Sequence, residues 1–278
     1  ASLPGSIAGL MSWETIYDSA WQHPGVAWIG GLVATSLLGL RYVADRRMLG
    51  RSQQVASHAG GLSTASASWS LLLLLQCLIC VDALFTGALS PFDASGVPAR
   101  VLSILFVVLG DARYFYLWLR LRATTATAPL VAVRALALGG ALSLLAYGLH
   151  RAAPAHLATG RHLFLTYELL LCGVVTLQFV RALRARFADQ ASGHGVVTSR
   201  ALVRLSLFEL AQYVLWAAAD LWILYVGDAA DIGFALRLLP NALYYVAFVP
   251  FVALFCRVSP DATARADVAP IPLQAVAS

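Results

Sequence analysis

The sequence predicts an all-helical membrane protein, a bundle of seven transmembrane helices with its N-terminus outside and its C-terminus in the cytoplasm. Three observations lead to this prediction: the composition, the run of long apolar stretches, and the distribution of arginine. Hydrophobic residues make up 60% of the 278 residues and charged residues only 12%, and the mean hydropathy is +0.76. Since a soluble domain carries about 25% charged residues, this chain is not built to face water on all sides.

Seven apolar stretches are each long enough to cross the hydrocarbon core of a bilayer, which takes about 20 residues of helix. The predicted spans are 24–43, 67–89, 98–120, 129–149, 160–181, 201–226 and 233–256. Turn residues such as Pro91 and Gly227 separate neighbouring spans, and a polar loop is expected from Arg181 to Arg200. Residues 23–257 then form one domain. It follows an interfacial segment, 1–22, whose tryptophans and tyrosine suit the headgroup zone, and it precedes a disordered cytoplasmic tail, 258–278.

The arginines give the predicted orientation. One set of span ends carries arginine at 41, 46, 47, 51, 120, 122, 134, 181, 184, 186, 200, 204, 257 and 265, whereas the opposite set carries it only at 100, 151, 161 and 237. The arginine-rich set belongs in the cytoplasm by the positive-inside rule. These side chains are spread over span ends instead of forming one basic face, so nucleic acid is not a predicted partner. The chain contains no lysine, which excludes Schiff-base chemistry.

The third predicted span is the most informative, because Asp111 and Arg113 fall near its middle. A charge at the membrane midplane is costly and usually functional. Two residues along a helix separate the side chains by about 200°, so each needs a partner from another span. Depth favours a carboxylate partner for Arg113, namely Asp82, Glu168 or Asp220.

The sixth span carries a polar stripe at helical spacing, formed by Glu209, Gln212, Tyr213, Trp216 and Asp220. Lipid cannot solvate such a stripe, so we expect it to face the bundle interior or a wet cavity. Its outer end would line a vestibule that opens to the outside, with the third span at its floor. The predicted ligand or ion pathway consists of Asp82, Asp111, Arg113, Tyr114, Glu168, Glu209, Gln212, Tyr213, Trp216, Asp220 and Asn241.

Five acids of this pathway face one deep base, so most of them must be protonated, hydrated or bound to a cation. That excess is typical of proton or cation coupling, and the alternative is that the acids are protonated and hydrogen-bond neighbouring helices together. No cofactor or metal is predicted. The four cysteines lie in apolar runs, and no span holds two histidines that could ligate haem. A metal bound by His150, His156 and His162 at the outer ends is the remaining alternative.

Two resemblances bear on function. Seven spans with an outside N-terminus are similar in topology to rhodopsins, G-protein-coupled receptors and SWEET sugar transporters, without their motifs. Three short patches, namely Asp82, Val108-Leu-Gly110-Asp111 and Pro240-Asn-Ala242-Leu243, resemble the intramembrane aspartyl proteases of the presenilin and signal-peptide-peptidase type. This resemblance implies that Asp82 and Asp111 share a proton and activate water. The patches depart from that pattern at Val108, where those proteases have glycine, and at Asn241, which interrupts their Pro-Ala-Leu motif; the chain also has two fewer predicted spans.

The sequence favours a multi-pass transporter or permease of the cytoplasmic (inner) membrane for a small solute or ion, coupled to protons or cations through its buried carboxylates. Its expected partners are the lipid bilayer, the solute, the proton or cation, and either a membrane protein or further copies of itself. The first alternative is a ligand-sensing or structural subunit of a membrane complex, and the second is an intramembrane aspartyl-type enzyme. A transporter loses flux when Asp111 or Glu209 changes, whereas a complex subunit loses partners when its lipid-facing surface changes.

Overall fold

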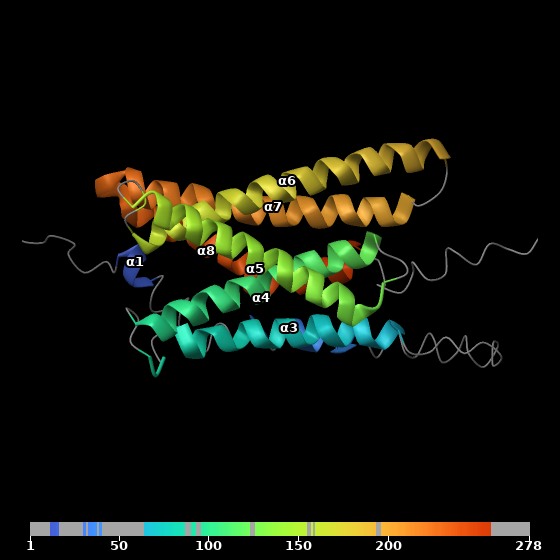
Figure 1. Cartoon of the computed structure of the whole chain (residues 1–278), viewed down its shortest axis with the longest axis horizontal. Helices are drawn as coiled ribbons and strands as arrows, with labels where there is room; N and C mark the ends of the chain where they lie inside the picture. Colours follow the sequence, from blue (N-terminus) through green and yellow to red (C-terminus); the bar gives the residue numbers. More distant parts are fainter. Residues whose placement is uncertain are drawn as a thin grey trace, which may run out of the picture.

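A computed structural model shows a bundle of long helices that run side by side (Figure 1). It describes residues 12–16, 30–31, 33–37, 39–40, 64–86, 90–92, 96–122, 126–154, 157, 159–192 and 196–256. Within these residues every regular element is helical and there is no strand.

The helices follow one another in alternating directions. The long ones are α3 (Thr64–Thr86), α4 (Val97–Arg122), α5 (Ala128–Ala152), α6 (Gly160–Ser192) and α7 (Val196–Tyr225). After the short 3-10 helix η2 (Gly227–Ala229), the chain runs on through α8 (Ala230–Ala242), η3 (Leu243–Ala247), α9 (Phe248–Phe251) and η4 (Val252–Cys256). The elements η3 and η4 are π-helical. The short helix α1 (Trp13–Ile16) packs against α8.

Five described helical segments are long and apolar enough to cross a membrane, which indicates a membrane-integral protein. They are Val97–Arg122, Ala128–Ala152, Gly160–Gln190, Ser199–Tyr225 and Ala230–Cys256. Helix α3, with 23 residues, occupies the second predicted span. Of the first predicted span, the described residues between 30 and 40 are helical. The count of seven stays a prediction, and the tail 258–278 and most of the segment 1–22 lie outside the described residues.

The predicted polar loop between Arg181 and Arg200 is wrong over most of its length. Helix α6 continues to Ser192, and α7 already begins at Val196. The reason is local: residues 182–192 include four alanines, two arginines and a leucine, which all favour helix. At the other end of α7 the chain turns at Gly227, whose φ of +60° is readily adopted only by glycine.

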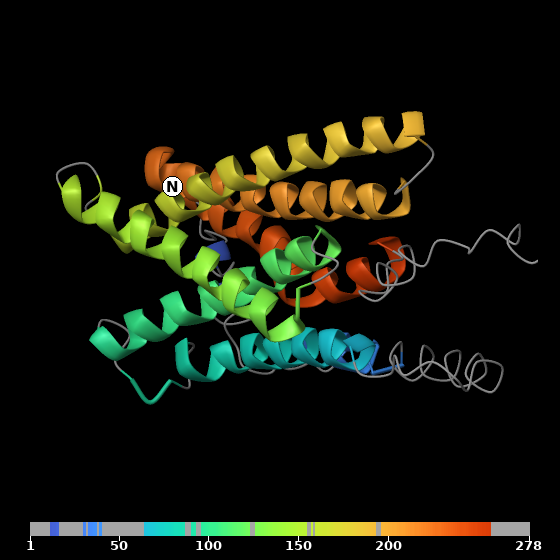
Figure 2. The same ribbon diagram turned by 45° about the vertical axis from the view of Figure 1, so that its right-hand side comes forward.

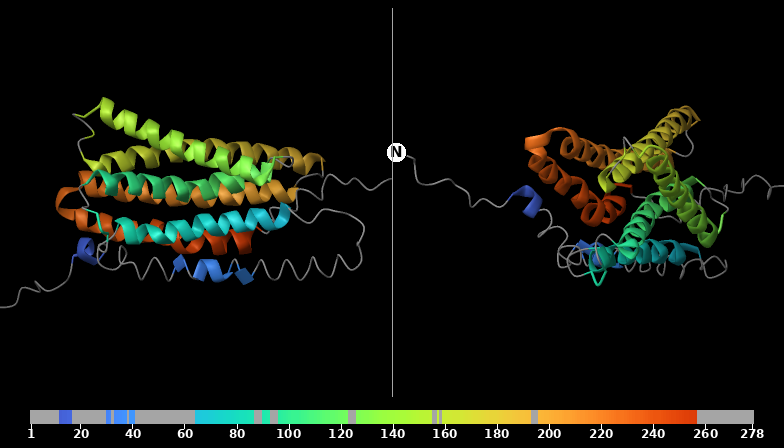
Figure 3. Two further views of the ribbon diagram at one scale, coloured as in Figure 1. Left: turned by 60° about the horizontal axis from the view of Figure 1, so that its bottom comes forward. Right: turned by 60° about the vertical axis from the view of Figure 1, so that its left-hand side comes forward.

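Helix α4 lies at the centre of the bundle. In its apolar stretch 56% of the residues are buried, against 22–33% in the other four candidate spans. It packs against α3 and α5 and also touches α7, while α6, α7 and α8 pack against one another in chain order. Figures 2 and 3 show α5 crossing the other helices obliquely on the outside. The span with Asp111 and Arg113 therefore holds the innermost position, where both side chains meet protein instead of lipid.

Candidate functional site

Asp111 joins three helices through its carboxylate. Tyr167 of α6 and Tyr213 of α7 each donate a phenolic hydrogen bond, one to each carboxylate oxygen of Asp111. All three side chains are buried. The sequence predicts that the partners of Asp111 lie on other spans. The structure confirms this prediction, and both partners are tyrosine hydroxyl groups.

Arg113 has different partners from those predicted. Its guanidinium donates to the side-chain oxygen of Gln76 on α3, to the backbone carbonyl of Tyr244 at 3.2 Å and to that of Gly110 at 3.0 Å. No carboxylate among the described residues lies within ion-pair distance of it. The expectation of a carboxylate partner from Asp82, Glu168 or Asp220 is therefore wrong for the described part of the chain. Arg113 is nevertheless only 1% exposed.

Backbone carbonyls are available to these side chains because the helix α8–η4 departs from α-helical geometry. Residues Leu243–Ala247 form a π-helical turn, in which each carbonyl pairs five residues onward. Pro250 has no N–H, so it cannot donate to the carbonyl of Tyr245 five residues before it. Gln76 donates its amide N–H to that carbonyl instead, at 3.2 Å. The π-turn and the proline thus form a neutral cradle for Arg113 and Gln76.

Aromatic rings complete this cradle. The guanidinium carbon of Arg113 lies 4.6 Å from the ring centroids of both Tyr244 and Phe248. Such a cation–π contact is worth about 2 kcal/mol when the cation is desolvated. The Tyr244 ring packs in turn against Trp216, with centroids 5.2 Å apart. Arg113 is thus held by hydrogen-bond acceptors and π-faces that carry no net charge.

The acids predicted to pair with Arg113 have other partners. Asp82 accepts a hydrogen bond from the Tyr245 hydroxyl at 2.9 Å. The two aspartates Asp82 and Asp111 are therefore held by different tyrosines, unlike a catalytic pair that shares one proton. Glu168 is buried, and its Oε2 has no hydrogen-bond partner among the described residues.

Asp220 is enclosed by two arginines. Arg161, at the start of α6, approaches one of its oxygens at 2.9 Å, and Arg237 of α8 pairs with the same oxygen. Asp220 is fully buried. The sequence predicts both arginines at span ends. In the structure both contact Asp220, at the end of the polar stripe where the sequence predicts an open vestibule.

The polar stripe of α7 faces the interior, as its spacing predicted: Glu209, Gln212 and Asp220 are all buried. The remaining predicted site residues form hydrogen bonds between helices. Trp216 donates to Asn241 of α8 at 2.6 Å, and Tyr114 of α4 donates to Gln178 of α6 at 2.5 Å.

The polar core consists of the predicted site residues and the polar side chains that contact them. Four of its members were not predicted: Gln76, Arg161, Gln178 and Arg237. Two of them carried a signal, because Gln76 and Gln178 are amides within otherwise apolar runs, Leu-Leu-Leu-Gln-Cys-Leu and Val-Thr-Leu-Gln-Phe-Val. A polar side chain at such a position forms a hydrogen bond between helices.

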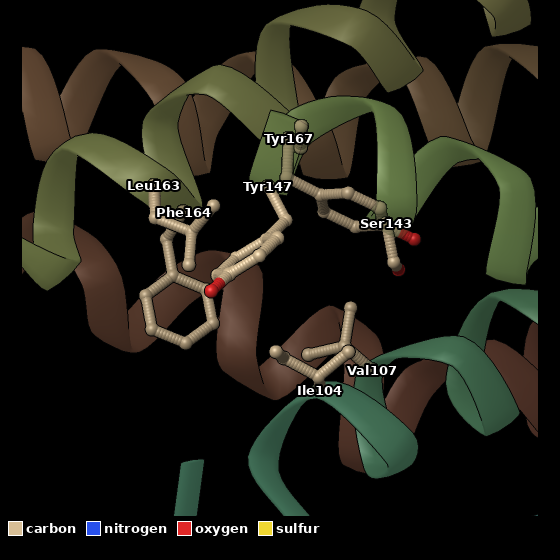
Figure 4. A pocket seen from close by; sticks show the side chains of 8 residues that line it. Ile104, Val107, Ser143, Tyr147, Leu163, Phe164 and Tyr167 are labelled. Atoms are coloured by element: carbon tan, nitrogen blue, oxygen red, sulfur yellow. The ribbon is translucent and has the colours of Figure 1, made fainter. Parts of the chain in front are cut away.

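A small, partly open pocket lies beside the polar core, between α4, α5 and α6. Its lining residues are Ile104, Val107, Ser143, Ala146, Tyr147, Leu163, Phe164 and Tyr167. Figure 4 shows Tyr147 and Phe164 close together on one side and Tyr167 reaching toward Ser143 on the other. The lining is mostly apolar, and Tyr147 and Phe164 are partly exposed. Tyr167 lines this pocket and also donates a hydrogen bond to Asp111.

No protein-family model, no curated protein and no solved structure matches this chain. Within the described residues no group of three or more histidine, cysteine or acidic side chains is arranged to hold a metal ion. The polar core offers buried carboxyl groups, of which Asp220 pairs with two arginines and Asp111 lies near Arg113. Such groups can bind and release a proton or a small cation inside the bundle.

Proposed function

We propose that this chain is a transporter or permease of the cytoplasmic membrane for a small solute or ion, coupled to protons or cations through its buried carboxylates. The observation that supports the proposal is the charge balance of the core. Asp111, Glu168, Glu209 and Asp220 are all buried, and of these four acids only Asp220 forms an ion pair with a described residue. The deep cation Arg113 is bound by neutral groups, so it does not consume a carboxylate.

The surroundings of Asp111 suit a group that changes its protonation state. An ionised Asp111 accepts from Tyr167 and Tyr213, as observed. A protonated Asp111 can donate to a phenol oxygen instead, because a tyrosine hydroxyl both donates and accepts and its proton rotates freely. The site therefore has a satisfied hydrogen-bond arrangement in both states, which a purely structural ion pair such as that of Asp220 does not require.

The proposed topology has seven spans, with the N-terminus outside and the arginine-rich ends in the cytoplasm. In a variant whose native cysteines are replaced by alanine, Gln190→Cys at the far end of α6 should resist a membrane-impermeant maleimide in intact cells. Ala152→Cys at the opposite end of α5 should be labelled, since both positions are exposed. Labelling at 190 with protection at 152 would reverse the orientation.

Transport is tested with the purified chain in liposomes on a solid-supported membrane, where coupled uptake appears as a transient current. The probes are alanine, lactate, glucose, uridine and sodium chloride, each at several pH values. We expect a pH-dependent current with at least one probe. Asp111→Asn should reduce that current at least tenfold, because the amide cannot exchange a proton.

The matched control is Asp189→Asn, the same change near the end of α6 outside the central core. It should keep the current of the unaltered protein. If none of the probes gives a current, the transport proposal fails. If Asp111→Asn carries the full current, the carboxylate has no role in coupling.

A further inference from the structure

Two neighbouring side chains on α7 have polar atoms without a partner. Glu209 is 3% exposed and Gln212 1%. Among the described residues, Oε2 of Glu209 and both Oε1 and Nε2 of Gln212 have no hydrogen-bond partner. Three residues apart on a helix, the two side chains lie on the same face. A buried polar group without a partner is costly, and surrounding hydrocarbon offers none. These atoms therefore mark a place where a small polar ligand binds.

The donor and acceptor pattern identifies the class of ligand. The carboxylate oxygen and the amide oxygen accept hydrogen bonds, whereas the amide nitrogen only donates. A metal cation would satisfy the two oxygens but would leave the N–H groups of Nε2 without an acceptor. Water donates to both oxygens and accepts from the nitrogen, and buried waters have two to four such partners. The site thus fits water in contact with an ionisable carboxyl group.

Glu209 is close to the groups that would exchange a proton with it. The charged and titratable side chains that face it are Asp111, Arg113 and Tyr114 of α4, Tyr213 on its own helix and Tyr244 of η3. On α6, Tyr167 lies beyond Asp111 and donates to it. Of these groups, Asp111 is the only other carboxyl. It is reached through Tyr213, which is one helical turn from Glu209 and donates to Asp111.

We propose that Glu209 and Gln212 form a hydrated proton-binding site through which Asp111 exchanges its proton with the arginine-rich side of the membrane. A proton leaves the Glu209 carboxyl group for the water, that water passes a proton to the Tyr213 hydroxyl oxygen, and Tyr213 gives its own hydroxyl proton to the Asp111 carboxylate. One negative charge thereby moves from Asp111 to Glu209, and both charge positions lie near Arg113. Glu209 is then reprotonated from the aqueous phase nearer Arg204. This inference rests on the proposed proton coupling, and it adds Glu209 as the group that connects Asp111 with the arginine-rich side of the membrane.

The site is tested by infrared titration of the full chain in lipid vesicles, following the C=O stretch that only a protonated carboxyl group gives. The unaltered protein should show such a band that disappears with rising pH, and Glu209→Gln should remove it. Gln212→Leu should keep the band but shift it to higher frequency, because the carboxyl group loses hydrogen-bonded water. Glu14→Gln, which alters an exposed acid on α1, should change nothing.

The outcomes separate this site from the proposed function. A band that is identical in Glu209→Gln, or unshifted in Gln212→Leu, overturns the hydrated site even if solute currents are intact. A band that responds to sodium at constant pH also overturns it, in favour of a metal cation. If the carboxyl band changes as expected in both Glu209→Gln and Gln212→Leu but no solute gives a current, the hydrated site is supported and the transport proposal fails. Gln212→Leu keeps the test valid if Glu209→Gln does not fold.

Discussion

Gly110→Ala is expected to lower the free energy of unfolding by about 3 kcal/mol or more, at the upper end of the range for overpacking. A Cβ atom at position 110 would lie 1.4 Å from the hydroxyl oxygen of Tyr244 and 2.3 Å from the ring carbon that carries it. The Tyr244 ring cannot move aside cheaply, because it stacks on Arg113 and packs against Trp216. One added methyl group should therefore disturb the whole cradle of Arg113.

The same substitution at Gly140 or Gly148 of α5 is the matched control. A Cβ atom at either position meets nothing within 4 Å. Since alanine favours helix by about 1 kcal/mol over glycine, these variants should melt at or above the temperature of the unaltered protein. The measurement is the midpoint of thermal unfolding in detergent, together with the yield of monodisperse protein. If Gly110→Ala melts with the controls, α4 and η3 do not approach each other as closely as the structure shows.

This steric role also accounts for the Gly-Asp pair that resembles an aspartyl-protease motif. Gly110 permits the Tyr244 hydroxyl to lie against α4, where it donates to the carbonyl of Phe106 at 3.3 Å. The close approach explains the glycine without any catalytic role for Asp111.

The positions of the described helices were predictable because two physical limits define them. The hydrocarbon thickness sets the length of a span, and arginines mark where it leaves the membrane. The buried face of α7 was also predictable, since a row of acids at helical spacing cannot face lipid. Glu209 and Asp220 are accordingly both buried. The extension of α6 beyond the membrane was missed because the apolar pattern ends before the helix does.

The partners of Asp220 were missed for a different reason. Arg161 and Arg237 were counted only as charges at the ends of spans. However, Asp220 lies five residues before the end of α7, about 8 Å along the axis, and Arg237 lies seven residues after the start of α8, about 11 Å. The two side chains therefore reach the same depth. Counting depth from the turn at Gly227, instead of from the last apolar residue, would have paired them.

The partners of Arg113 were not predictable from side-chain charges. Counting acidic and basic side chains assumes that every backbone carbonyl is already hydrogen-bonded within its own helix, as in an ordinary α-helix. Here a π-turn and Pro250 make carbonyls of η3 available to other helices. The prolines at 240 and 250 were the signal in the sequence, but they do not show which carbonyl is freed or toward which helix it points.

Arg113→Ala is expected to lower the free energy of unfolding by about 3–5 kcal/mol, although no ion pair is lost. Removing the guanidinium leaves the side-chain oxygen of Gln76 buried without this donor, at about 1–3 kcal/mol, and takes one donor from the backbone carbonyl of Tyr244. It also leaves a cavity beneath the Tyr244 and Phe248 rings, which adds to the loss. Arg134→Ala on α5 is the control: its side chain is exposed, and its loss should leave the free energy of unfolding within about 0.5 kcal/mol of the original value.

Second substitutions show which partners matter, because only groups that share an interaction couple in a double-mutant cycle. Arg113→Lys should restore little of the stability that Arg113→Ala loses. One ammonium group cannot reach Gln76, Gly110 and Tyr244 together or stack between two rings. Adding Gln76→Leu to Arg113→Ala should recover part of the loss, because it removes one of the stranded acceptors. Adding Asp220→Asn should recover nothing and should cost more, because it strands Arg161 and Arg237. Recovery with Asp220→Asn but not with Gln76→Leu would show that Arg113 is paired with the acid after all, and the neutral cradle described for it would then be wrong.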